Sequence, residues 1–83
     1  MEKRMTKRLR LEYYLDLPYR LVITPDDEGY GVAVPDLPGC FTHAQTWEDI
    51  PVMVREAMAL WLGVMLEDGK PIPEPSAELS RAG

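Results

Sequence analysis

Residues 19–45 read YRLVITPDDEGYGVAVPDLPGCFTHAQ, and this stretch decides the fold. Larger apolar side chains recur at every second position over residues 19–24 and again over residues 30–34, which is the pattern of half-buried strands. The segment Pro25-Asp26-Asp27-Glu28-Gly29 between them has the proline and glycine of a hairpin loop. We therefore predict an antiparallel hairpin. Its second strand has the small residues Gly31 and Ala33 on one face, where we expect the helix or another subunit to pack closely.

The residues that follow predict a third strand and one long helix. The segment Pro35-Asp36-Leu37-Pro38-Gly39 interrupts the ladder, and residues 40–45 can form the next strand. Thr46 can cap a helix with Asp49 as the capping-box acid, and Gly69 followed by Pro71 predicts its end, so we expect a helix from about residue 47 to residue 68. Pro51 leaves two possibilities open: a distorted first turn, or a regular helix that starts nearer Pro51.

The predicted helix has more apolar surface than one sheet can cover. At 100° per residue its apolar side chains span an arc of roughly 200°, about twice what a single sheet face needs. The surplus flank predicts a contact with another subunit or with a different protein, and we expect the contact of a homo-oligomer at Met53, Ala57, Leu60, Trp61 and Val64. The alternative is that the N-terminal segment folds back over this flank.

The two ends of the chain are less regular. Over residues 6–17, Leu9, Tyr13 and Leu17 recur every four positions, which favours a short helix, although alternation over the same residues also fits a strand. Prolines in the tail predict an extended edge strand or a polyproline segment, at Pro71, Pro73 and Pro75. We expect a basic lead-in over residues 1–17 and one α+β domain over residues 18–83.

The charge of the chain is unevenly distributed. Its 83 residues contain 9 basic and 14 acidic side chains, a net charge of −5, but residues 1–10 hold five basic and one acidic. The remaining residues therefore have four basic and thirteen acidic side chains, a net −9. Such a body is a poor nucleic-acid binder and suits a basic protein partner. The basic N-terminus fits a solvated tail better than a nucleic-acid contact.

No catalytic or metal-binding constellation is evident. Cys40 and His43 alternate onto opposite strand faces and lack an orienting group, so they do not suggest a nucleophile and base. The acidic run at 26–28 lacks the spacing of a calcium loop. We expect no metal, no cofactor and no enzymatic activity. The single cysteine, the charged N-terminus and the short apolar runs predict a cytoplasmic protein without a membrane span.

Residues 19–75 contain motifs that resemble the HicB-like antitoxin family. The resemblance covers Tyr19-Arg20-Leu21-Val22-Ile23, Asp27-Glu28-Gly29-Tyr30, Val34-Pro35-Asp36-Leu37-Pro38-Gly39-Cys40 with Thr42 and Thr46, Glu56-Ala57, Leu60-Trp61-Leu62, Glu67-Asp68-Gly69 and Ile72-Pro73-Glu74-Pro75. Two positions depart from the family pattern: relatives usually have a glycine between the two threonines, and alanine at position 51.

The resemblance implies a fold and a function. The fold would be a three-stranded antiparallel sheet with a helix across one face and a short C-terminal strand, similar to a partial ribonuclease H fold. The function would be that of an antitoxin that forms homo-oligomers, dimers or tetramers, and masks HicA, a small basic toxin that cleaves messenger RNA. Many relatives add a DNA-binding domain, but only fourteen residues follow Gly69 here, so we do not expect DNA binding by this chain.

The residues expected to meet the toxin lie in two turns, namely Asp26, Asp27, Glu28, Tyr30, Pro35, Asp36 and Leu37. One alternative is an orphan HicB-like module that oligomerises and binds another protein or a small ligand. Another is a degenerate nuclease, which the fold analogy alone suggests. Metal-dependent phosphoryl chemistry needs clustered carboxylates, whereas the acids of this chain lie mainly in turns and on the helix surface.

Overall fold

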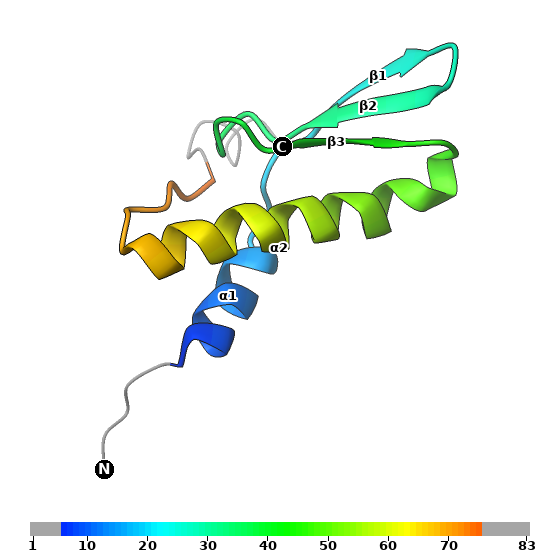
Figure 1. Ribbon diagram of the computed structural model, residues 1–83. Helices are drawn as coiled ribbons and strands as arrows, with labels where there is room; N and C mark the ends of the chain where they lie inside the picture. Colours follow the sequence, from blue (N-terminus) through cyan, green and yellow to red (C-terminus); the bar gives the residue numbers. More distant parts are fainter. Residues whose placement is uncertain (1–5, 76–83) are drawn as a thin grey trace.

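The computed structural model describes residues 6–75 as a three-stranded sheet with two helices stacked beneath it (Figure 1). The strands are β1 (Val22–Asp26), β2 (Gly29–Ala33) and β3 (Phe41–Ala44), antiparallel in the order β1-β2-β3. Helix α2 (Ile50–Asp68) packs mainly under β3, and helix α1 (Lys7–Leu15) packs against α2. The predicted α+β class and the three-stranded antiparallel sheet are confirmed.

The first hairpin has a tighter loop than the sequence suggests. Strand β1 begins at Val22 and includes Pro25 and Asp26, so the loop contains only Asp27 and Glu28. Gly29 has a φ of +138°, and a Cβ there would lie 2.2 Å from the carbonyl oxygen of Ala44. Glycine is therefore required at this position, because β3 passes close to the end of the hairpin.

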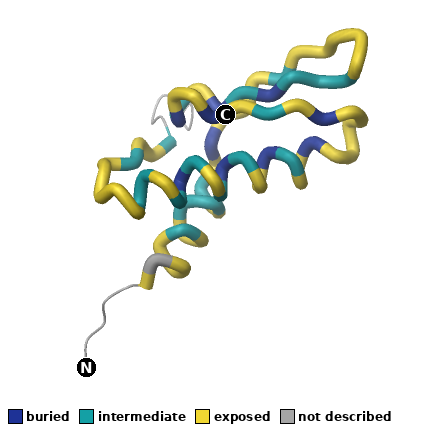
Figure 2. The backbone as a smooth tube through the Cα atoms, in the orientation of Figure 1, coloured by how far each residue is buried: buried dark blue, intermediate teal, exposed yellow. Residues whose placement is uncertain are grey.

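The core lies between the inward face of the sheet and one stripe of α2. The stripe repeats every four residues, as Ile50, Val54, Met58 and Leu62, all of them buried. It meets Val32 and Ala44 from the sheet together with three residues of the loop between β2 and β3, namely Val34, Leu37 and Cys40. Figure 2 colours buried positions dark blue, and they occur on the strands, on the loop and along α2.

The start of the long helix combines the two possibilities that Pro51 left open. Thr46 accepts a hydrogen bond from the backbone N–H of Asp49 at 3.2 Å, and Trp47–Asp49 form a turn of 3₁₀-helix. Regular α-helix begins at Ile50, with Pro51 in its first turn. Proline is harmless there because the first N–H groups of a helix have no intrahelical partner. The helix ends as predicted at Gly69, which has a left-handed φ of 66°.

The N-terminal segment is a helix, as favoured, and Thr6 caps it by accepting from the backbone N–H of Leu9 at 3.1 Å. The predicted short C-terminal strand is absent from residues 70–75, which run alongside the body without a ladder partner. Side chains hold this segment instead. Ile72 packs on the core, the hydroxyl of Tyr19 donates to the carbonyl of Pro73, and the hydroxyl of Tyr13 donates to Glu74 at 3.2 Å.

Candidate functional site

The tip of the β1–β2 hairpin is an exposed acidic projection. Asp26, Asp27 and Glu28 are all exposed, and Figure 2 shows the whole tip on the surface. Asp26 also shapes the turn, because its Oδ1 accepts the backbone N–H of Glu28 at 2.8 Å. That hydrogen bond, assisted by His43, lowers the pKa of Asp26. The side chains of Asp27 and Glu28 are the ones the tip offers to a partner.

His43 reaches Asp26 across the middle strand. Its Nε2 lies 3.1 Å from Oδ2 of Asp26, although β2 separates the two strands. The pair forms on the outer face of the sheet, where the nearest β2 residues are Gly31, opposite His43, and Gly29, opposite Asp26. Sequence reasoning missed this contact, and the small residues of β2 were its only signal. We expected the helix or a subunit to pack on that face, but α2 packs on the opposite face, which has Val32 and Ala44.

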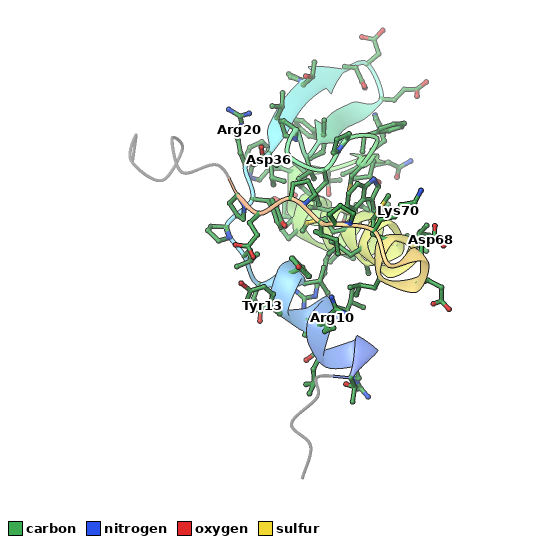
Figure 3. All side chains as sticks on the ribbon, turned by 90° about the vertical axis from the view of Figure 1, so that its left-hand side faces the viewer. Arg10, Tyr13, Arg20, Asp36, Asp68 and Lys70 are labelled. Atoms are coloured by element: carbon green, nitrogen blue, oxygen red, sulfur yellow. The ribbon has the colours of Figure 1, made fainter. Side chains whose placement is uncertain are left out.

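The structure does not bring the two predicted toxin-contact segments together. The hairpin tip and the loop of residues 34–40 lie at opposite ends of β2 (Figure 1). Figure 3 looks onto the loop end, where Asp36 is labelled near Arg20. Pro35 is exposed and Asp36 is half-buried, so both can still contact a partner at that end.

Two residues of the predicted toxin-contact set belong to the interior. Leu37 has no exposed surface, because the loop folds inward with hydrogen bonds from Leu37 N–H to Val34 and from Cys40 N–H to Leu37, both 2.9 Å. The side chain of Leu37 therefore has no surface in this structure through which to contact a partner. Tyr30 is half-buried on the inward face, with its ring edge-to-face on Trp47 at 5.6 Å, so little of it can reach a partner.

An apolar groove of about 500 Å³ runs between β3 and α2. Its wall on the sheet side is Gly39–Thr42, and its helical wall contains all five residues predicted to form the subunit contact, Met53, Ala57, Leu60, Trp61 and Val64. Leu60 is 74% exposed and Val64 is 55% exposed. The indole Nε1 of Trp61 donates to the carbonyl oxygen of Pro38 at 2.8 Å, which attaches the loop to the helix at one end of the groove.

Helix α1 leaves this groove open. It packs against the other flank of α2, where Leu15 lies beside Val54, Arg55 and Met58. Asp16 approaches Arg55 at 4.0 Å on the same side. The N-terminal segment thus folds back onto α2, as the alternative supposed, but it covers a different part of the apolar arc.

Cys40 and His43, the two residues considered as nucleophile and base, have separate surroundings. Cys40 is buried, which raises the pKa of its thiol, while His43 is engaged with Asp26. No three His, Cys, Asp or Glu side chains gather as a metal site within residues 6–75. Within the same residues no helix is long and apolar enough to span a membrane.

Comparison with known proteins adds a family model and several relatives. The model of the HicB-like antitoxins of bacterial toxin-antitoxin systems matches residues 19–81. A UPF0150 protein of Thermoplasma acidophilum is 35% identical over 63 residues, which are 75% of this chain and 91% of that protein. A UPF0150 protein of Archaeoglobus fulgidus is 40% identical over 57 residues, 65% of this chain and 83% of that protein.

Two further similarities concern a phage and a solved complex. An uncharacterised 14.9 kDa protein of Haemophilus phage HP1 is 36% identical over 56 residues, 68% of this chain but only 42% of the phage protein. Among solved structures, a chain of the HicA3 and HicB3 toxin-antitoxin complex superposes with a TM-score of 0.66 at 32% identity. That match covers 76% of this chain and 73% of the other.

Proposed function

Because the chain belongs to the HicB-like antitoxin family of bacterial toxin-antitoxin systems, we propose that it binds and masks a basic, messenger RNA-cleaving toxin of the HicA type. The observation that carries the proposal is the family match over residues 19–81, which includes the whole sheet and α2. The likeness to a chain of a toxin-antitoxin complex supports it. On this proposal the protein acts by covering its partner and performs no chemistry itself.

The hairpin tip is the part of the molecule best suited to a basic partner. It presents Asp27 and Glu28 on a two-residue loop that projects from the sheet (Figure 1). Carboxylates in such a position attract a basic protein over a distance and raise its association rate. Pro35 and Asp36, at the other end of β2, would contact the toxin only if it extends along the sheet.

The test is an RNA-cleavage assay with the toxin of the HicA type and increasing amounts of this chain. We expect cleavage to stop once the antitoxin is equimolar with the toxin. Full cleavage in the presence of excess antitoxin would contradict the proposal and favour an orphan module that binds something else.

A charge reversal tests the role of the hairpin tip. Asp27→Lys combined with Glu28→Lys should slow association with the toxin by about tenfold at low salt, and the loss should shrink as salt is added. Glu67→Lys combined with Asp68→Lys is the control, because it makes the same change of net charge at two exposed positions at the far end of α2, where Figure 3 labels Asp68. Equal slowing by the control would mean that net charge acts without regard to position.

A further inference from the structure

The acidic hairpin tip takes its shape in part from the side chain of Asp26. This residue ends strand β1, and its Oδ1 accepts the backbone N–H of Glu28 at 2.8 Å across the two-residue loop. An aspartate that accepts an amide two positions later fixes the backbone between them as a local turn. The direction in which Asp27 and Glu28 point therefore follows the position of the Asp26 carboxylate.

His43 holds that carboxylate from the opposite edge strand. Strands β1 and β3 lie on either side of β2 (Figure 1), about 9.6 Å apart at the usual strand spacing, so a contact between their side chains must cross the middle strand. Nε2 of His43 lies 3.1 Å from Oδ2 of Asp26 and 3.3 Å from Oδ1. The path is open because Gly31, opposite His43, has no side chain. The carboxylate is thus shared between the loop and His43.

Asp26 is the charged neighbour of His43 on the outer face of the sheet. The neighbours of His43 on this face come from all three strands and are Thr24, Asp26, Gly31 and Phe41. Among the described residues, Asp26 is the ionisable group recorded in contact with the imidazole. Along the chain, the next charged residues are Asp27 and Glu28 on the loop and Glu48 after β3.

The protonation state of His43 changes what it offers to Asp26. A neutral imidazole has one N–H, which lies on Nε2 in one of its two tautomers, whereas the imidazolium ion donates from both nitrogens and has a positive charge. Histidines commonly change between these forms between about pH 5 and 8. Asp26 is ionised throughout that range, because the hydrogen bond from Glu28, with further help from His43, holds the pKa of its carboxyl below the usual value. The protonated form therefore holds Asp26 more firmly.

We propose that His43 is a positioning residue for the acidic tip: it fixes Asp26, and through Asp26 the loop that presents Asp27 and Glu28, most firmly when its imidazole is protonated. The consequence for binding rests on the proposed function. A loop that is already fixed loses less conformational freedom when the toxin binds, so the complex dissociates more slowly. The hold of the tip on a basic partner accordingly weakens as the pH rises and the imidazole loses its proton.

Two substitutions of equal charge separate the hydrogen bond from the proton. His43→Gln keeps an N–H donor close to the position of Nε2 but does not titrate, and His43→Leu has neither property. Phe41→Leu is the control, because it introduces the same leucine on the same strand and face, one cross-strand row further from the tip. His43 and Phe41 are both exposed, so none of the three changes disturbs the core.

The first measurement uses the free chain. NMR order parameters of the backbone N–H groups of Asp27 and Glu28 are compared at about pH 5.5 and about pH 8, on either side of the usual histidine titration. We expect both amides of wild type to be more rigid at the lower pH. His43→Gln should have the same rigidity at both pH values and exceed His43→Leu. Phe41→Leu should follow wild type.

The second measurement is the rate at which the HicA-type toxin dissociates from each variant. Each rate is divided by that of wild type at the same pH, so that titration of the toxin itself cancels. Because an exposed pair contributes little, we expect dissociation from His43→Leu to be about threefold faster than from wild type at the lower pH and less than about twofold faster at the higher pH. His43→Gln should lie between the two.

The positioning role would be overturned by equal loop rigidity in the glutamine and leucine variants, by a wild-type loop that does not respond to pH, or by an equal loss in Phe41→Leu. Unchanged toxin dissociation from a variant whose loop has loosened would contradict the link between tip and toxin. A tip that responds as expected in a chain that leaves the toxin fully active would keep the positioning role and contradict the proposed function instead.

Discussion

Tyr19 joins two segments that are far apart in the chain. Its ring is buried beside the core, and its hydroxyl donates a hydrogen bond to the carbonyl oxygen of Pro73. Burial is the main reason that the pKa of Tyr19 rises to about 12, and the nearby Tyr14 and Glu74 add to it. A phenolate could neither donate this hydrogen bond nor be solvated in that position, so the folded chain retains the proton longer than the unfolded chain does.

Replacement of Tyr19 by phenylalanine should change the alkaline stability profile. Because the folded pKa is raised above the usual value of 10, the stabilisation by Tyr19 is fully present below pH 10 and is lost as the pH rises towards 12. We expect Tyr19→Phe to lower the free energy of unfolding by about 1 kcal/mol at pH 8 through the lost hydrogen bond. Between pH 10 and 12 its stability should fall less steeply than that of wild type. Urea unfolding across this range checks the prediction, and parallel curves would contradict it.

The burial of single residues could be predicted where the local alternation of apolar and polar side chains determines it. Alternation identified Val32 and Val34 as inward-facing, and both are buried. The burial of Leu37 could not be predicted from alternation, because Leu37 lies among turn residues. The hydrogen bonds of the folded loop direct its side chain inward. Tyr19 was assigned to a strand, but its partner lies 54 positions away, and no periodic signal reports a contact of that range.

One glycine inside α2 and one at its C-cap show how position in an element decides the effect of a substitution. Gly63 is in the helix interior, and a Cβ added there meets nothing within 4 Å. Gly69 is the C-cap, with a left-handed φ of 66° that other residues rarely adopt. The same change to alanine should therefore act in opposite directions at the two sites.

We expect Gly63→Ala to stabilise the protein by about 0.5–1 kcal/mol, because alanine is the better helix former. Gly69→Ala should destabilise it by about 1 kcal/mol through strain at the cap. Thermal unfolding of the two variants side by side is the measurement. Changes of the same sign would show that backbone conformation is not what distinguishes the two positions.

At the scale of elements, the sequence predicted whether a segment is a strand or a helix better than it predicted where the segment begins and ends. All three strands and both helices were anticipated, and the end of α2 was placed correctly because Gly69 has one clear conformational role. The start of β1 was placed too early, because alternation continues through residues that pack without pairing. The short C-terminal strand was implied by the family resemblance, whereas the prolines of the tail left an edge strand or a polyproline segment open. Side-chain contacts hold that segment.

The whole molecule is a stack of three layers, with α1 as the outermost. Leu11, Tyr14 and Leu15 of α1 pack against the core residues of α2, while Leu9 is exposed. At the edge of this layer Asp16 forms an exposed ion pair with Arg55. Such a pair contributes little to the free energy of unfolding. Apolar burial is therefore what attaches α1 to the domain.

A pair of substitutions in α1 measures that attachment. Leu11→Asp should lower the free energy of unfolding by about 2 kcal/mol, because it places a carboxylate against the apolar flank of α2. Leu9→Asp, on the exposed side of the same helix, should lower it by less than about 1 kcal/mol, the usual helix-propensity loss. Chemical denaturation compares the two. Similar losses would mean that α1 is only loosely associated with α2.

The global arrangement of surfaces was the least accessible to prediction. The apolar excess of α2 was visible as a helical arc, and its five subunit-contact candidates do line one groove. The sequence could not indicate that α1 would cover the other flank, since either flank has enough apolar surface. Nor did the sequence indicate that the hairpin tip and the loop of residues 34–40 lie far apart. Their distance depends on β2, which runs between them.

The attachment of residues 73–74 to Tyr13 and Tyr19 has a mechanical consequence. A force applied at the C-terminal end would load these two hydrogen bonds one after the other and peel the tail from α1. The strands would carry no tension until the peeling had passed the left-handed turn at Gly69. In a pulling experiment the chain should therefore lengthen first by a short step at low force, with the sheet giving way afterwards as a separate event.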